Sequence, residues 1–374
     1  MAALYKRVYE ALRQGIVDGR YPVGTKLPSE AELSKTFSVS AITVKRAFEL
    51  LRVDGLIVRR PRLGTFVTSS SPVPQRATTV TGGAKPLVGV LLTNFDDTFG
   101  THVIEGMMAA AGTDAYLIVT RSMGDIDQED EHIRSLIGAG VSGLALLPSS
   151  SAYIPPAALE LVTQQFPLVI LDRIFEGIPV STVCSDNRSG ARAATEHLLR
   201  LGHRTVGFVS AAGHVSTSDD RRNGYVDAHA TLDVPLENSA ELRTLASTIP
   251  GSTTDTEDDI KALVGFVRDN PAITGYLAAE YNIALMLREA CGRLGLRVPA
   301  DISIVCFDHP EARFDSGLFR FTHVRQQQRQ LGERAIGTVQ AQLGDRHLVE
   351  KIVLPTKLMQ GASTAPAPFS TPGR

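Results

Sequence analysis

The segment LPSEAELSKTFSVSAITVKRAFELLRVDG, residues 27–55, decides the fold of the N-terminal part of the chain. Residues 29–32 read Ser-Glu-Ala-Glu, a capping box in which the serine and the second glutamate satisfy backbone N–H groups at a helix start. Ser40 predicts the start of the next helix, because its side chain can accept a hydrogen bond from the first turn. The apolar residues of that helix share one face, made of Val44, Ala47, Leu50 and Leu51.

The flanking residues complete a small domain. Apolar residues at helical spacing predict a helix over residues 2–18. Residues 56–59 and 65–67 are β-rich and flank a turn rich in arginine, so they predict a hairpin. Three helices and a hairpin predict a winged helix-turn-helix over residues 1–67.

Hydroxyl and cationic side chains lie outside the apolar face of the third predicted helix. Thr43, Lys45 and Arg46 have this position, which suits contact with base edges and phosphates in a major groove. The same pattern also fits a solvated helix face with no ligand, so position alone leaves both interpretations open.

Four motifs resemble the winged-helix domain of GntR-type bacterial transcription regulators. They are Leu4-Tyr5, residues 24–30, residues 39–44 and residues 64–67. The resemblance implies that DNA is contacted by Ser29, Thr43, Lys45, Arg46, Arg62 and Gly64. Alanine occupies positions 31 and 41, where the family often carries arginine, so the operator need not follow the usual consensus.

Charge is distributed unevenly along the 374 residues. Residues 1–86 hold 14 Lys and Arg against 6 Asp and Glu, whereas residues 87–374 hold 24 against 34. A basic head on an acidic body is typical of a chain whose head binds a polyanion. Residues 68–86 are rich in Ser, Thr, Pro and Gly and predict a linker, and residues 361–374 predict a disordered tail.

Several classes of protein are disfavoured by composition. No apolar run reaches the roughly 18 residues of a membrane-spanning helix, and the N-terminus is an amphipathic helix and not a signal peptide. The three cysteines are far apart and lack CxxC spacing, which argues against a disulfide framework or a zinc site. We therefore expect a cytoplasmic protein without a metal or other cofactor.

Residues 87–360 alternate short Val, Ile and Leu runs with helical patterns. The alternation runs from residue 87 to residue 171 and resumes from residue 205 to residue 306, which predicts two doubly wound parallel sheets of the α/β class. Ligands of such sheets bind beyond the carboxyl ends of the strands, so two facing lobes predict a cleft.

The same region resembles the effector domain of LacI/GalR-type repressors, which share the periplasmic sugar-binding protein fold. The matching motifs include residues 167–173, 197–204, 221–225 and 295–308. The resemblance implies a ligand site lined by Phe95, Phe99, Asp172, Arg221, Asp308 and Gln326. Glu280 and Tyr281 stand where the family usually has Asn-Asp; Tyr281 could stack on a ligand ring or only fill space.

The combination predicts a ligand-responsive transcription regulator that binds double-stranded operator DNA as a homodimer. We expect a repressor of carbohydrate-utilisation genes that a sugar-like effector releases. A non-sugar effector or an activator fits the same residues. A sugar-binding enzyme or transport-type binder is disfavoured, because the sequence has no catalytic motif and no export signal.

Overall fold

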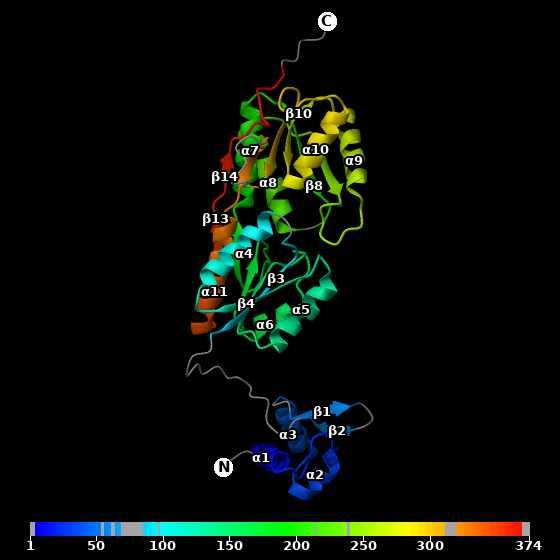
Figure 1. Ribbon diagram of the computed structural model, residues 1–374, viewed down its shortest axis with the longest axis vertical. Helices are drawn as coiled ribbons and strands as arrows, with labels where there is room; N and C mark the ends of the chain where they lie inside the picture. The colour runs from blue at the N-terminus through cyan, green and yellow to red at the C-terminus, as the bar shows by residue number, and fades with distance from the viewer. Residues whose placement is uncertain are drawn as a thin grey trace. The chain divides into compact units, whose positions relative to one another are not determined.

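The chain divides into two units, residues 1–84 and residues 85–374, which are described separately (Figure 1). The computed structural model describes residues 4–53, 56–60, 64–68, 85–95, 98–213, 215–237, 240–310 and 319–368. Most of the predicted linker therefore lies outside the described residues, and the boundary between the units falls inside it.

The first unit, called the head, is a winged helix-turn-helix. Its elements are α1 (Leu4–Val17), α2 (Glu30–Phe37), α3 (Ala41–Val53), β1 (Ile57–Arg60) and β2 (Gly64–Val67). The predicted capping box is present, since Ser29 N–H donates to Glu32 at 2.7 Å and Glu32 N–H donates to the Ser29 hydroxyl at 3.3 Å. The predicted apolar face of α3 packs on α1, with Val44, Ala47 and Leu51 fully buried.

The second unit has two lobes, each a six-stranded sheet between two layers of helices (Figure 1). Lobe 1 contains β3 (Leu87–Leu92), α4 (Thr98–Ala111), β4 (Tyr116–Arg121), α5 (Ile126–Gly138), β5 (Gly143–Leu146), α6 (Pro156–Thr163), β6 (Leu168–Leu171), β7 (Ser181–Ser185), α11 (Gln328–Gly344) and β13 (Lys351–Leu354). Its strands are all parallel and run in the order β13-β7-β6-β5-β3-β4. Helices α4 and α11 cover one face, and α5 and α6 cover the other.

Lobe 2 repeats this plan. It contains α7 (Asn187–Arg200), β8 (Thr205–Ala211), α8 (Ser216–Thr231), β9 (Glu241–Leu245), α9 (Thr256–Asp269), β10 (Ile273–Ala278), α10 (Tyr281–Arg293), β11 (Ser303–Phe307), β12 (Thr322–Arg325) and β14 (Lys357–Met359). The strand order is β14-β12-β11-β10-β8-β9, and β14 alone among these strands is antiparallel to its neighbour. Helices α7 and α8 cover one face, and α9 and α10 cover the other.

The chain crosses between the lobes three times. The crossings follow β7, β12 and β13, and they begin at about Ser185, Arg325 and Leu354. In lobe 1, β13 and β7 are the two strands at one edge of the sheet, and two of the crossings leave from them. In lobe 2, β14 and β12 are the two strands at one edge, and the third crossing leaves from β12. All three connections therefore lie at one side of the interlobe space, on the side of β13 and β14 in Figure 1.

The prediction of a disordered tail from residue 361 is wrong for residues 361–368. Ser363 is fully buried, and its hydroxyl accepts from Thr322 N–H at 2.8 Å. Its carbonyl accepts from Ile304 N–H at 2.9 Å, and Ala367 N–H donates to Leu201 at 2.8 Å. The segment is ordered because it satisfies backbone groups of lobe 2, a long-range effect that its Pro- and Ala-rich composition does not show.

Two glycines bring α4 and α11 into close contact. A Cβ on Gly332 would lie closer than 3.0 Å to the backbone of α4 at Val103 and Met107, and a Cβ on Gly106 would meet Arg329 of α11 in the same way. These two helices also join the first half of lobe 1 to the segment that returns from lobe 2.

We expect Gly332→Ala to destabilise the chain by about 1–3 kcal/mol, because the methyl group would force the two helix backbones apart. Gly337→Ala is the matched control in the same helix, since Gly337 is exposed and a Cβ there meets nothing within 4 Å. The control should be neutral or stabilising by up to about 1 kcal/mol. Urea unfolding measures both changes, and equal effects would contradict the proposed close contact.

Candidate functional site: the head and an interlobe cavity

The head presents the predicted DNA contacts around the start of α3. Lys45 and Arg46 are exposed and Thr43 is half-buried. The Arg46 guanidinium lies 4.6 Å from the centre of the Tyr5 ring, and the Thr43 hydroxyl is 2.8 Å from that of Ser40. Both side chains are thus held in place by neighbours within the head.

Ser29 and Gly64, which are also predicted DNA contacts, have structural roles in the head. The Ser29 hydroxyl is part of the capping box of α2, and this hydrogen-bonded environment lowers the pKa of Glu32. Gly64 has φ +116°, a conformation that L side chains rarely adopt, and a Cβ there would collide with the side chain of Lys26. Arg62 lies outside the described residues.

Sequence reasoning missed two residues of this surface, Lys26 and Ile42. Backbone hydrogen bonds from Leu27 to Thr65 and from Val67 to Thr25 place Lys26 beside the hairpin. Ile42 is 79% exposed on the first turn of α3. The signal that could have found Ile42 is its place between Ala41 and Thr43, off the buried face of the helix.

A cavity of about 720 Å³ lies between the two lobes. Six of the seven residues predicted to bind a ligand line it: Phe99, Asp172, Arg221, Tyr281, Asp308 and Gln326. Sequence reasoning missed Asn94, Ser149, Arg173, Thr248 and Asn282, which also line it. Because the carboxyl ends of the parallel strands of both lobes face this space, residues distant in sequence meet here.

The seventh predicted residue, Phe95, lies elsewhere. Its ring packs against the core of lobe 1, and the Arg121 guanidinium lies 5.5 Å from the ring centre. Thr93, Asn94 and Phe99 line the cavity, whereas Phe95 does not. Proximity in sequence to the end of β3 was therefore not sufficient to place Phe95 in the site.

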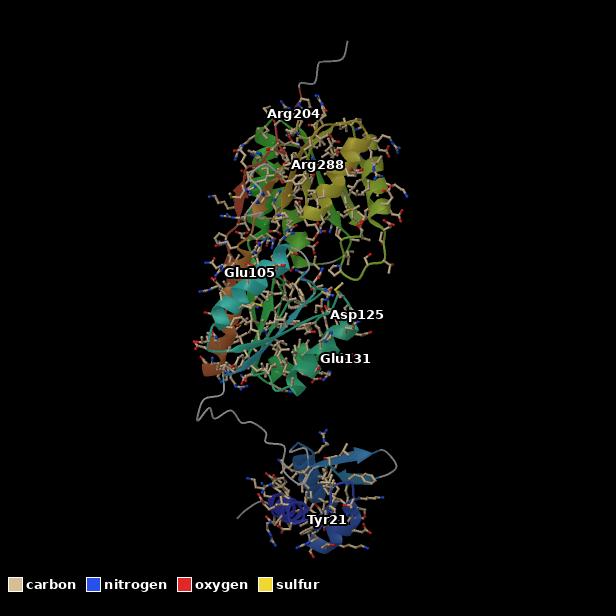
Figure 2. All side chains as sticks on the ribbon, viewed as in Figure 1. Tyr21, Glu105, Asp125, Glu131, Arg204 and Arg288 are labelled. Atoms are coloured by element: carbon tan, nitrogen blue, oxygen red, sulfur yellow. The ribbon has the colours of Figure 1, made fainter. Side chains whose placement is uncertain are left out.

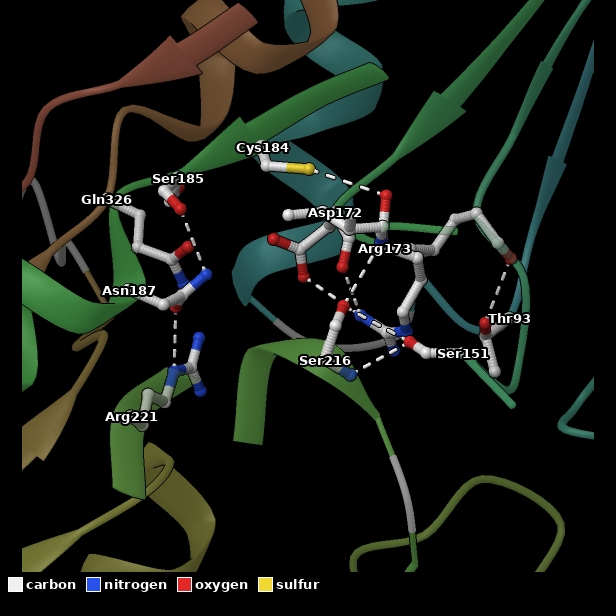
Figure 3. Close-up of polar contacts among 12 residues, drawn as sticks. Thr93, Ser151, Asp172, Arg173, Cys184, Ser185, Asn187, Ser216, Arg221 and Gln326 are labelled. Carbon is white, nitrogen blue, oxygen red and sulfur yellow. Dashed lines mark hydrogen bonds and ion pairs between the residues drawn. The ribbon is translucent and has the colours of Figure 1, made fainter. Parts of the chain in front are cut away.

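Arg221 is a half-buried cation that lines the cavity. Its Nε donates to the Asn187 side chain at 2.8 Å and its Nη1 donates to the Ala279 carbonyl at 2.6 Å. Its guanidinium lies 4.0 Å from the centre of the Phe307 ring. Burial lowers the pKa of Arg221, whereas the carboxylates of Asp308, Asp172 and Glu280 act in the opposite direction. Figure 3 shows the bond between Arg221 and Asn187.

Two aspartates occupy equivalent places in the two lobes. Asp172 directly follows β6 and Asp308 directly follows β11, and both have left-handed backbone conformations with φ of 50° and 61°. Asp308 accepts from Gln326 at 2.8 Å and from Gln328 at 2.6 Å. Asp172 accepts from Arg173 at 3.1 Å, while its burial raises its pKa (Figure 3).

Among the residues that line the cavity, two buried acceptor atoms lack a hydrogen-bond partner within the described part of the chain. They are Oδ1 of Asp172 and Oε1 of Gln326, whose residues are 7% and 3% exposed. A buried acceptor without a donor costs free energy, and a hydroxyl or amino group placed in the cavity would supply the missing donor.

Tyr281 and Glu280 form another wall of the cavity. The Tyr281 ring meets His309 and Phe321 edge-on, with ring centres 5.2 Å and 6.1 Å apart. The Glu280 carboxylate accepts a short hydrogen bond from the Thr248 hydroxyl. Tyr281 is thus fixed by aromatic neighbours and also faces the cavity, which leaves both predicted roles for its ring possible.

The comparison with known families agrees with the two units. Residues 4–67 match the family of "Bacterial regulatory proteins, gntR family", and residues 195–364 match the "Periplasmic binding protein-like domain". The chain joins a gntR-family helix-turn-helix domain to a periplasmic binding protein-like domain. This confirms the predicted fold class and both resemblances.

Known relatives of this two-domain chain are transcription regulators. The arabinose metabolism transcriptional repressor of Geobacillus stearothermophilus is 28% identical over 312 residues, which are 81% of each chain. The ribose operon repressor of Halalkalibacterium halodurans is 25% identical over 59% of this chain and 62% of that protein.

Solved structures of LacI-type regulators share the fold of the periplasmic binding protein-like domain. A LacI family regulator from Enterococcus faecium with bound ribose has a TM-score of 0.63 at 22% identity, covering 75% of this chain and 99% of that one. The lac repressor dimer bound to operator also has a TM-score of 0.63, at 19% identity, covering 76% and 96%.

Across the described ranges, no group of three His, Cys, Asp or Glu side chains is arranged to hold a metal ion. Among the helices described here, none combines the length and apolar character needed to cross a bilayer. The three cysteines are buried and unpaired.

Glu129 supports one rim of the cavity from within lobe 1. This buried residue of α5 accepts from Ser149 N–H at 2.7 Å and from the Ser122 hydroxyl at 3.2 Å. Burial raises the pKa of Glu129, although these hydrogen bonds act in the opposite direction. The folded chain therefore binds this proton more tightly than the unfolded chain does.

We expect the stability of the wild type relative to Glu129→Gln to rise as pH falls from neutral towards 4.5, the usual glutamate pKa. The wild-type carboxylate takes up its proton in this range, whereas the amide does not titrate. Glu131→Gln is the control, because Glu131 is exposed on the same helix (Figure 2). Urea unfolding across this pH range measures the difference, and a pH-independent difference would contradict the shift.

Proposed function

We propose that this chain is a transcription regulator that binds operator DNA with its head and a sugar-like effector in the interlobe cavity. The observation that carries the proposal is the cavity, where the half-buried Arg221, three carboxylates and two unpartnered acceptor atoms meet. A polyhydroxy ligand both donates and accepts hydrogen bonds and so matches this lining. The arabinose and ribose repressors among the relatives support the same class of effector.

The head binds DNA through Ser29, Thr43, Lys45, Arg46, Arg62 and Gly64 in this proposal. We add Lys26, which stands beside Gly64, and Ile42. An exposed isoleucine at the start of a groove-reading helix suits the methyl group of thymine, which only the major groove presents. The apolar Ala41 beside it favours the same kind of contact.

We further propose that the chain works as a homodimer in the cytoplasm, with two heads on two half-sites of an operator. The lac repressor is a dimer on its operator, which supports this arrangement. An effector shifts the DNA-binding equilibrium only if it binds one arrangement of the lobes more tightly than another. The repressor names of the relatives favour release from DNA by the effector.

Lys45→Ala tests the DNA-binding surface. Duplexes are first selected from a random pool by the full-length protein, and binding is then measured at several salt concentrations. Loss of one phosphate contact should weaken binding at all selected sequences and reduce the slope of log K against log salt by about 1. Lys261→Ala, on an exposed position of α9, is the control and should bind normally. Normal binding by Lys45→Ala would remove Lys45 from the interface.

Asp308→Asn tests the cavity. A ligand that binds the folded state at a hundredfold excess over Kd stabilises it by about 2.7 kcal/mol, so the Tm of the wild type should rise with a sugar from a panel of L-arabinose, D-ribose and D-galactose. The variant should lose this rise and keep DNA binding, because the amide replaces a charged acceptor. Asp269→Asn, which is exposed on α9, is the control. A wild type that responds to none of these sugars would contradict a simple sugar as effector.

A further inference from the structure

Two loops of different lobes meet on the side of the cavity opposite the three chain crossings. One loop, residues 122–125, follows β4, and the other, residues 246–252, follows β9. Strands β4 and β9 are the edge strands of their sheets, at the opposite edge from β7, β13, β12 and β14. In Figure 1 the helices that follow these loops, α5 and α9, lie on the side away from β13 and β14.

The loops approach each other through a reciprocal pair of glycines. A Cβ on Gly124 would lie closer than 3.0 Å to the Pro250 carbonyl oxygen, and a Cβ on Gly251 would lie closer than 3.0 Å to that of Met123. Both glycines have left-handed backbone conformations, with φ of 82° and 77°. In each case the obstacle is backbone, which cannot rotate away as a side chain can.

Each loop is fixed to its own lobe by a buried carboxylate. Glu129, on the first turn of α5, holds Ser122 and Ser149 as described above. Asp259, on the first turn of α9, accepts from the backbone N–H of Ala246 at 3.0 Å and of Ser247 at 2.7 Å. Because hydrogen bonds fix each loop to its own lobe, the two loops can separate only if the lobes themselves move apart.

A second interlobe contact joins residues whose chain neighbours line the cavity. Ser216, at the start of α8 in lobe 2, donates its N–H to the Ser151 hydroxyl of lobe 1 at 2.8 Å. The Ser216 hydroxyl accepts from Ile174 N–H of lobe 1 at 3.2 Å (Figure 3). The described residues therefore bring the lobes into contact both at these serines and at the two glycine loops.

We propose that Gly124 and Gly251 are positioning residues that form a latch between the lobes. Glycine at both positions lets the loop backbones meet, so the lobes close over the cavity at the side away from the crossings. Any side chain at either position holds the lobes apart and opens the cavity on that side. The latch is a property of the second unit alone and does not depend on DNA binding or on the identity of the effector.

The test measures the distance between the lobes in the full-length chain without added ligand. Spin labels are attached at Glu131→Cys on α5 and Lys261→Cys on α9, which are both exposed and follow the two loops. The three native cysteines are buried, so labelling is directed to the introduced ones. Pulsed dipolar spectroscopy then gives the distribution of interlobe distances.

The labelled parent should show a population at the short distance that the contacting lobes impose. Gly124→Ala and Gly251→Ala should each lose this population and show a longer distance. Gly140→Ala is the matched control, since Gly140 has φ +84° but a Cβ there meets nothing within 4 Å. It carries the same backbone strain without the interlobe collision and should keep the short distance.

Three results would overturn the latch. They are a parent without the short-distance population, a short distance retained in both Gly124→Ala and Gly251→Ala, and an equal loss in Gly140→Ala. The two latch variants add the methyl group to different lobes. If one variant fails to fold, the other still tests the latch. Thermal unfolding of each variant beside Gly140→Ala separates loss of the latch from loss of the fold.

Discussion

The contacts of the half-buried Arg221, whose pKa is lowered by burial, are the interactions on which the two-lobed unit depends. A buried cation is costly unless charges and hydrogen bonds surround it. Asn187, the carbonyl of Ala279 and the ring of Phe307 supply the direct contacts. These three residues lie on the first turn of α7, at the end of β10 and at the end of β11. The Arg221 side chain therefore holds three elements of lobe 2 together at the cavity.

The carboxylates around this cation come from both lobes. Asp172 belongs to lobe 1, and Glu280 and Asp308 belong to lobe 2. Asp308 in turn accepts from Gln326 and Gln328, which lie where the chain returns to lobe 1. The electrostatic environment of the cavity therefore depends on the distance between the two lobes. A ligand that forms hydrogen bonds to both Asp172 and Asp308 would change the same interlobe distance as the proposed latch.

Much of the head could be predicted from sequence because its signals are local. The capping box of Ser29 and Glu32 and the apolar face of α3 involve residues three or four apart, and the structure has both. The cavity residues were placed by a resemblance to known motifs, and six of the seven line it. Phe95 does not line the cavity although Asn94 and Phe99 do, because the direction of a side chain depends on the local backbone conformation, which spacing in the sequence does not carry.

The sequence by itself determined the winged head with its three helices and the α/β class of the second unit, since these follow from periodicity and helix caps within short windows. Only the tertiary structure decided which strands meet. Strand β13 pairs with β7, so that Lys351 lies opposite Thr182, and residues 361–368 complete lobe 2. The contact of Gly124 with Pro250 is of the same kind. Such pairings join backbone groups far apart in the chain, and no local pattern specifies them.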